Sequence, residues 1–188
     1  DYVFDGTAHK PYVESDKVNP LSQYGTTKRQ GETALIALEP ESIIIRTAWL
    51  YSPYGKNFVK TMLRLGSTGQ PVSVVCDQIG TPTYALDLAN AIVQILSSRQ
   101  WVPGIYHFTD AGVASWYDFA QQIFHLSGNR NVLISPVPAT EYPTVATRPC
   151  YSVLNCQRIV ATYDVSQPYW VDSLADCLRR LNEEETNC

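Results

Sequence analysis

The sequence predicts an α/β fold, because strand-like and helix-like segments alternate from one end of the chain to the other. Of its 188 residues, 45% are apolar, which is enough to bury a sizeable core. The chain contains no repeat, low-complexity run or linker that would divide it into independent parts. Charged residues make up 17% and the formal net charge is −4, which excludes the basic surface of a nucleic-acid-binding protein.

The first 40 residues should hold a strand end, a loop and a helix. Residues 1–4 have a strand-like composition, and the polar segment 5–18 is expected to be a loop. Asn19 and Pro20 form a good helix start, with Asn19 as the N-cap. The helix should end near residue 38, before Pro40. The face of this helix that should pack inward consists of Leu21, Tyr24, Lys28, Gly31, Leu35 and Leu38. Two of these residues are polar and one is a glycine, which is unusual for a face that packs inward.

The rest of the chain continues the alternation. Residues 42–51 begin with a continuous β-branched run, which is typical of a buried parallel strand. Further strands are expected at 72–76, 104–108 and 132–137. Helices are expected at 57–65, at 84–96, at 115–126 with Ser115 as the N-cap, and at 172–181. Residues 183–188 should form a frayed tail.

The cysteines argue against both a disulfide framework and a zinc site, because they are odd in number, widely spaced and include no CxxC pair. They are Cys76, Cys150, Cys156, Cys177 and Cys188. We interpret them as reduced thiols of a cytoplasmic protein, and the sequence offers no metal-ligand cluster that we would assign. No segment is long and apolar enough to cross a membrane, and the first residues have no signal-peptide core, so no membrane partner is expected.

Tyr24 and Lys28 form a YxxxK pair on the first predicted helix. The i,i+4 spacing places a phenol and an ammonium group on one helix face. A nearby cation stabilises phenolate, which suits a tyrosine that acts as a general acid or base. Such a pair could hand a proton to a carbonyl oxygen while a nicotinamide delivers hydride to its carbon. The motif alone is weak, since a surface tyrosine beside a solvated lysine has the same spacing.

The segments around this pair make the chain resemble the extended short-chain dehydrogenase/reductases that act on nucleotide sugars. Within that superfamily it is most similar to the dTDP-4-dehydrorhamnose reductases. The resemblance covers nearly the whole chain and rests on several motifs in the right order, at residues 1–6, 11–16, 19–32, 46–52, 55–63, 77–83, 104–107, 115–120 and 148–149.

The resemblance implies the C-terminal part of a Rossmann-type NAD(P)-binding fold with a smaller α/β substrate-binding lobe. Residues 1–71 would be a remnant of the Rossmann domain. Residues 72–188 would be mainly the substrate-binding lobe, with some segments returning to the Rossmann sheet. The implied reaction is the reduction of dTDP-4-dehydro-L-rhamnose to dTDP-L-rhamnose, a sugar donor for cell-surface polysaccharide. The cofactor would be NADPH, with NADH as the alternative.

The resemblance also implies roles for individual residues. Tyr24 would donate the proton to the C4 ketone, and Lys28 would hold the nicotinamide ribose. The cofactor-binding residues would be Tyr24, Lys28 and Thr47, and the residues that bind the dTDP-sugar would be Trp49, Asn57, Phe58, Gln78, Thr81 and Arg148. Two parts of the family pattern are not in these residues: the catalytic Ser or Thr that would precede Asp1, and the glycine-rich turn that cradles the pyrophosphate. The isolated chain is therefore expected to be inactive.

Plainer interpretations and rival functions stay open at this point. Asn57 could simply cap a helix, Arg148 could be solvated, and His107 and Trp116 are expected to be structural core residues. Another nucleotide-sugar epimerase or dehydratase, a non-catalytic regulatory subunit of the methionine adenosyltransferase type, and an autonomous sugar-nucleotide-binding module are the alternative functions.

The partial sheet predicts a homodimer or self-association of this chain, because an uncovered sheet edge and apolar faces favour pairing between chains. Analytical sedimentation should show species larger than the monomer that grow with protein concentration. A sharp monomer peak at high concentration would count against this expectation.

Overall fold

The computed structural model describes residues 1–129, 131–142 and 147–186, and these residues form the predicted α/β fold. The helices are α1 (Gln23–Leu38), α2 (Phe58–Gly66), α3 (Ala85–Ser97), α4 (Trp116–Leu126), α5 (Gln157–Tyr163) and α6 (Trp170–Thr186), with a 3₁₀ turn at Ala139–Glu141. The strands are β1 (Ile43–Arg46), β2 (Leu50–Tyr51), β3 (Val72–Val75), β4 (Ile79–Gly80), β5 (Thr83–Tyr84), β6 (Gly104–His107), β7 (Ala114–Ser115) and β8 (Ile134–Val137).

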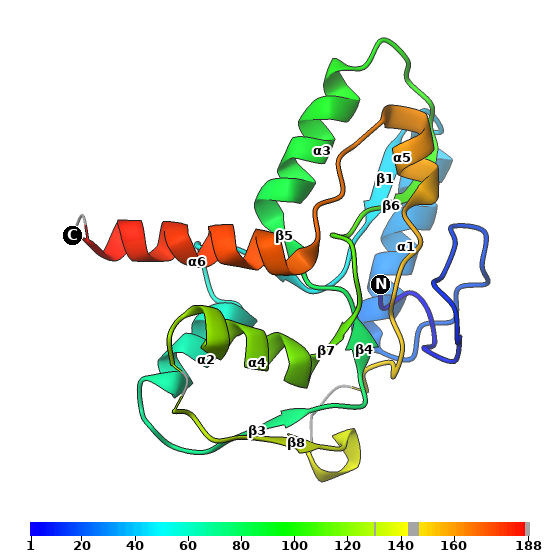
Figure 1. Ribbon diagram of the computed structural model, residues 1–188. Helices are drawn as coiled ribbons and strands as arrows, with labels where there is room; N and C mark the ends of the chain where they lie inside the picture. The colour runs from blue at the N-terminus through cyan, green and yellow to red at the C-terminus, as the bar shows by residue number, and fades with distance from the viewer. Residues whose placement is uncertain (130, 143–146, 187–188) are drawn as a thin grey trace.

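The upper part of the molecule in Figure 1 is built on the parallel pair β1 and β6, in which Arg46 lies opposite His107. Side chains alternate between the two faces of these strands. Tyr106 and Phe108 pack with α3 and α5 in a buried apolar cluster. Arg46 and His107 point to the opposite face, where α1 lies. One face of this strand pair is therefore apolar, and the other carries buried polar groups.

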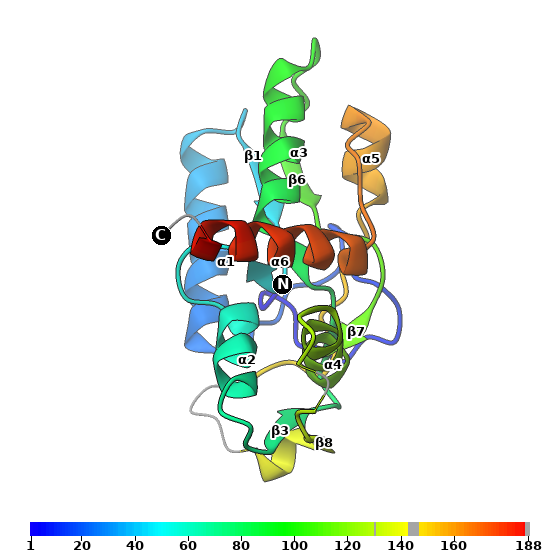
Figure 2. The same cartoon turned by 60° about the vertical axis from the view of Figure 1, so that its left-hand side comes forward.

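The lower part combines the parallel pair β3 and β8 with helices α2 and α4 (Figure 2). Helix α6 crosses between the upper and lower parts in both views. Leu174 and Cys177 of α6 are fully buried in the same cluster as Phe119 of α4. Two short ladders, β2 with β5 and β4 with β7, lie where the chain passes between the parts. No helix of the described residues is long and apolar enough to span a membrane.

The start of α1 differs from the prediction. The helix begins at Gln23 and its N-cap is Ser22, whose hydroxyl accepts the backbone N–H of Gly25 at 3.1 Å. The side-chain amide of Asn19, the predicted cap, instead donates a hydrogen bond to the Asp5 carboxylate at 3.2 Å. This contact with the preceding loop uses the side chain that was expected to cap the helix. Residues 1–4 form a turn rather than a strand end, closed by a hydrogen bond from the Phe4 N–H to the Asp1 carbonyl.

The predicted inward face of α1 is also wrong. Leu35 and Leu38 are exposed, as are the other positions of that stripe, while the buried residues of the helix are Gly25 and Glu32. A Cβ atom at position 25 would lie 2.1 Å from the Tyr2 carbonyl oxygen, so only glycine allows this close approach. The helix therefore packs through a glycine and a carboxylate rather than through its apolar stripe.

Smaller differences have local causes. The expected strand at 42–51 is split into β1 and β2 by Trp49, whose backbone is left-handed. Helix α5 was not predicted, since it is only seven residues long and follows an irregular segment, although Ile159 and Tyr163 bury one face of it. Helix α6 begins at Trp170 and continues through most of the expected frayed tail to Thr186. Residues 187–188 of that tail lie outside the described residues. The four described cysteines are free thiols, as expected.

A buried carboxyl group joins the end of β6 to the start of α3. Asp110 is 1% exposed, and its Oδ2 accepts the backbone N–H of Tyr84 at 3.0 Å. Its Oδ1 has no hydrogen-bond partner among the described residues. Burial raises the pKa of Asp110 to about 7, and the negative charge of nearby Asp87 adds to the rise. The folded protein therefore favours the protonated form of Asp110 well above the usual pH range of an aspartate.

This raised pKa predicts that stability falls as the pH rises. The contribution of protonated Asp110 is complete below its ordinary pKa near 3.8 and is lost as the pH passes through about 7. Asp110→Asn keeps an acceptor for the Tyr84 N–H and removes the charge. It should stabilise the fold at pH 8 by on the order of 2 kcal/mol, and the gain should shrink toward pH 4.

Thermal denaturation between pH 4 and pH 8 measures this effect. Asp164→Asn, at an exposed position, is the control and should leave the pH dependence unchanged. An equal effect of Asp110→Asn at both ends of the pH range would contradict the assignment.

Candidate active site

Tyr24 and Lys28 lie together on the exposed face of α1, as their spacing predicts. The Lys28 Nζ is 5.4 Å from the centroid of the Tyr24 ring, and Tyr24 is 58% exposed. The ring of Tyr2 meets Tyr24 edge-on with centroids 6.0 Å apart. The Ser22 cap fixes the helix start two residues before Tyr24, so the phenol leaves the first turn of the helix. A proton donor beside a cation is thus presented to solvent on a defined element.

A hollow of about 320 Å³ lies beside Tyr24. Tyr24 and Lys28 line it from α1, and Thr47 lines it just after the end of β1. The Thr47 Oγ1 is buried and has no hydrogen-bond partner within the described chain. Because an unpaired buried hydroxyl is costly, this oxygen suits a ligand that brings its own polar groups. The ammonium, the phenol and the orphaned hydroxyl fit the nicotinamide and ribose end of a dinucleotide, and the volume admits only part of one.

A second hollow, of about 400 Å³, also has Tyr24 in its lining. It is lined by Tyr24, Trp49 and Arg148, three of the predicted site residues, together with Asp1, Tyr2, Ser22, Trp116 and Thr147. Both hollows are lined by Tyr24, together with Asp1 and Tyr2, so the Tyr24 phenol lies where the two hollows adjoin. The second hollow combines indole rings with an exposed guanidinium, which are the groups expected for a sugar attached to a diphosphate.

Trp49 is held in a strained position by three constraints. Its backbone φ is 45°, which is rare for a residue with a side chain and costs about 1–3 kcal/mol. Its ring stacks on Trp116 with centroids 3.6 Å apart and planes 10° from parallel. A Cβ atom at position 80 would lie 2.6 Å from the Trp49 ring, so Gly80 is required for this packing. The three constraints fix the indole as one wall of the second hollow.

Trp116 packs against the buried core, as expected from the sequence, and its ring also lines the second hollow, which the sequence did not predict. It is the first residue of α4, directly after the predicted N-cap Ser115. The Ser115 hydroxyl accepts the Asp118 N–H at 3.0 Å and the Asp118 carboxylate accepts the Ser115 N–H at 2.9 Å, which completes a capping box. A large aromatic ring at the first position of a capped helix was the signal that could have identified Trp116 as a residue that lines the hollow.

Four predicted substrate-binding residues are not among the residues that line the two hollows. Asn57 caps α2 by accepting the Lys60 N–H at 3.2 Å, and Phe58 packs against Trp116 at 4.7 Å between ring centroids. Gln78 is buried. The Thr81 hydroxyl donates to the Gly112 carbonyl at 2.9 Å and lines a separate cavity of about 570 Å³. These four assignments stay predictions. Arg148 is exposed and lines the second hollow.

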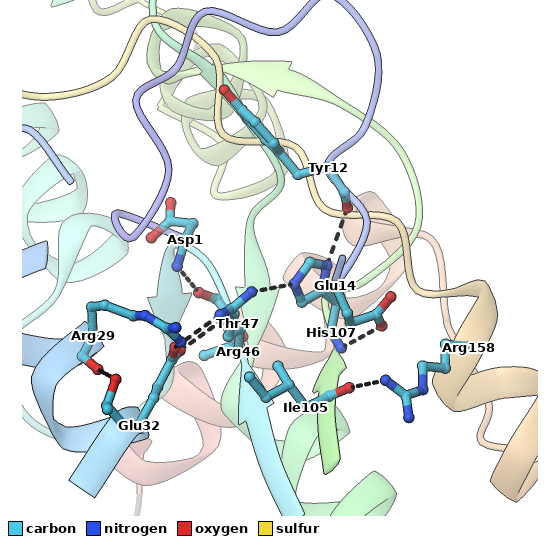
Figure 3. Close-up of polar contacts among 11 residues, drawn as sticks. Asp1, Tyr12, Glu14, Arg29, Glu32, Arg46, Thr47, Ile105, His107 and Arg158 are labelled. Carbon is cyan, nitrogen blue, oxygen red and sulfur yellow. Dashed lines mark hydrogen bonds and ion pairs between the residues drawn. The ribbon is translucent and has the colours of Figure 1, made fainter. Parts of the chain in front are cut away.

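A buried ion pair connects the helix that carries Tyr24 with the strand that precedes Thr47 (Figure 3). The Arg46 Nε donates to the Glu32 Oε1 at 2.7 Å, and the Arg46 Nη2 donates to Oε2 at 2.8 Å. Burial works to raise the pKa of Glu32, but the hydrogen bonds and charges of Arg46 and Arg29 outweigh it and the pKa lies below the ordinary value. Glu32 is therefore an ionised carboxylate inside the protein. Among the described residues no cluster of three or more His, Cys, Asp or Glu could hold a metal ion.

Comparison with known proteins decides the family. The RmlD substrate binding domain family matches residues 1–183. The chain belongs to this family. The resemblance to dTDP-4-dehydrorhamnose reductases, drawn from the sequence, is thereby confirmed.

Three relatives illustrate how much of the family's length is present. The dTDP-4-dehydrorhamnose reductase of Sinorhizobium fredii is 41% identical over 92% of this chain and 61% of its own length. The crystal structure of the Clostridium acetobutylicum reductase has a TM-score of 0.90 and 43% identity, and the match covers 96% of this chain and 63% of that one. The Bacillus anthracis reductase, solved in complex with NADP, has a TM-score of 0.87 and 37% identity over 95% of this chain and 62% of that one. The chain thus spans about three fifths of the relatives' length.

Proposed function

We propose that a protein with this chain and the full length of its relatives reduces dTDP-4-dehydro-L-rhamnose to dTDP-L-rhamnose with NADPH. The observation that carries the proposal is the position of Tyr24 at the junction of two hollows. One hollow has groups that suit the reactive end of a dinucleotide, and the other has groups that suit a sugar diphosphate. The relatives named above are dTDP-4-dehydrorhamnose reductases, and one was solved with NADP.

The proposed chemistry is the addition of a hydride and a proton to the C4 ketone of the sugar. Bound NADPH supplies the hydride to the carbonyl carbon. Tyr24 donates its hydroxyl proton to the ketone oxygen, so the carbonyl becomes a secondary alcohol. Lys28 stabilises the phenolate that remains on Tyr24 and holds the nicotinamide ribose. Thr47 offers its unpaired hydroxyl to the same end of the cofactor.

The second hollow is proposed to bind the sugar and its diphosphate. Trp49, backed by Trp116, gives an apolar wall against which a deoxy sugar can pack. Arg148 supplies a positive charge to the diphosphate. As the family resemblance implies, Asn57 and Phe58 would contribute to substrate binding next to these two indole rings. Gln78 and Thr81 would lie beside the nucleotide diphosphate.

The division of the chain is part of the same proposal. Residues 1–71 would be the remnant of the Rossmann domain and residues 72–188 mainly the substrate-binding lobe. The pairing of β6 with β1 supports a return of the second part to the first sheet. Exposed apolar side chains on α1, including Leu35 and Leu38, support the expected self-association of the isolated chain. That chain would be inactive, since a glycine-rich pyrophosphate-binding turn is not among its residues.

Tyr24→Phe in the full-length protein should reduce kcat by about 10²–10⁴-fold, because the phenylalanine ring has no proton to give. The substrate KM and the thermal stability should change little, since Tyr24 is exposed. NADPH oxidation with dTDP-4-dehydro-L-rhamnose measures the effect. Tyr54→Phe, which removes the hydroxyl of another exposed tyrosine, is the matched control and should retain full activity.

Two outcomes would contradict the proposal. Undiminished turnover by Tyr24→Phe would remove Tyr24 from the chemistry. A folded wild-type protein that binds NADPH but does not turn over the keto-sugar would favour a regulatory, non-catalytic role.

A further inference from the structure

Helix α1 is attached to the rest of the described protein at very few points. Only Gly25 and Glu32 of its sixteen residues are buried. Gly25 lies against the Tyr2 carbonyl and fixes how closely the first turn approaches the N-terminal segment. A backbone contact at one position does not by itself set the rotation of a helix about its axis. The other buried contact, through the side chain of Glu32, gives a second point of attachment, and two points restrict that rotation.

Glu32 is well placed to orient the groups proposed to react. It follows Lys28 by four residues and Tyr24 by eight, so the three side chains lie along one side of the helix. Its partner Arg46 directly precedes Thr47 at the end of β1. The 320 Å³ hollow is lined by all of these residues, namely Tyr24, Lys28, Glu32, Arg46 and Thr47. The ion pair therefore joins the helix that carries the phenol and the ammonium to the strand that carries the orphaned hydroxyl.

The geometry of the pair is specific. Two nearly parallel hydrogen bonds, 2.7 and 2.8 Å long, join the Arg46 fork to both oxygens of the Glu32 carboxylate. Such a bidentate contact fixes the angle between the two planes as well as the distance. Arg29 adds a contact of 3.0 Å to Glu32 from the same helix, which cannot position that helix relative to β1.

Arg46 is itself held from its other side (Figure 3). The His107 Nδ1 lies 3.1 Å from the Tyr12 carbonyl oxygen, and because that oxygen can only accept, Nδ1 carries the hydrogen. The His107 Nε2 is then an acceptor, and the Arg46 Nη1 donates to it at 3.4 Å. Burial, and then the charge of Arg46, lower the pKa of His107 to about 4, so the ring is neutral at physiological pH. The guanidinium also lies over the Phe4 ring, 5.2 Å from its centroid.

A buried ion pair is a poor source of stability. Glu32 and Arg46 are 8% and 5% exposed, and removing both charges from water costs roughly what their attraction returns. Replacement of such pairs by apolar residues of similar volume is often neutral or stabilising. The pair is better explained by the geometry that it imposes.

We propose that Glu32 and Arg46 are positioning residues for the proposed reduction: their ion pair sets the placement of Tyr24 and Lys28 relative to Thr47. This inference rests on the proposed function and gives Glu32 and Arg46 a role that acts through Tyr24, Lys28 and Thr47. Reaction rates depend steeply on such placement, since a displacement of about 1 Å can cost about 10²-fold in rate.

Three variants of the full-length protein test the inference. Arg46→Lys keeps the charge and loses the bidentate fork, and Glu32→Gln keeps the shape and loses the charge. Each should lower kcat by about 10–100-fold and weaken NADPH binding, while the substrate KM changes little. Arg29→Lys, which alters the other partner of Glu32 within the same helix, is the control and should stay within about threefold of wild type.

The double variant Glu32→Met/Arg46→Met separates positioning from stability. It leaves neither charge unpaired and should recover a melting temperature near that of the wild type. If the pair positions α1, kcat and NADPH affinity stay low in the double variant although the fold is stable. If kcat and NADPH affinity recover together with the melting temperature, the pair has only a structural role and the inference is overturned.

The outcomes for this inference and for the proposed function are distinct. Full activity of folded Glu32→Gln and Arg46→Lys, with Tyr24→Phe inactive, would overturn the positioning role alone. If the wild type does not turn over the keto-sugar, the proposed reaction fails. The dissociation constant of NADPH then tests the positioning role by itself. Weaker binding in both single variants supports that role, and unchanged binding overturns it.

Discussion

The ion pair between Glu32 and Arg46 is the contact on which the placement of the candidate active site depends. Helix α1 has few buried side chains, and its apolar stripe faces outward. Without this pair, little in the described chain would fix the rotation of the helix that carries Tyr24 and Lys28. The neutral ring of His107 and the carbonyl of Tyr12 hold the guanidinium in turn. Polar contacts, rather than apolar packing, thus hold the part of the site that we propose for the cofactor.

The part of the site that we propose for the substrate is held in a different manner, by close packing of aromatic rings. Trp49 adopts a left-handed backbone at the break between β1 and β2, its ring stacks on Trp116, and Gly80 leaves room for that ring. Strain of this kind persists where the surrounding structure fixes the residue, and it is frequent at ligand sites. Tyr24 lines both hollows, which is the position that the proposed proton donor between a cofactor and a sugar requires.

The sequence predicted the elements and motifs that depend on local patterns. The YxxxK spacing, the β-branched run at 43–45 and the Ser115 cap are local signals, and each was confirmed as a structural feature. The inward face of α1 was wrong because a glycine contact and a buried carboxylate replaced apolar packing there. Asn19 is not the cap, since it bonds Asp5, and the place of Trp116 in the second hollow was not predicted, since it depends on stacking with Trp49. Tertiary contacts of this type have no periodic signature.

The most direct measurement is a crystal structure of the full-length protein with NADP⁺ and dTDP-L-rhamnose. The Tyr24 hydroxyl should lie within about 3.2 Å of the sugar O4. The nicotinamide ribose should contact Lys28 and Thr47, and the sugar should pack on Trp49. A sugar bound in the 570 Å³ cavity beside Thr81, or a nicotinamide outside the hollow of Lys28 and Thr47, would contradict the assignment of Tyr24 to the junction of the two ligands.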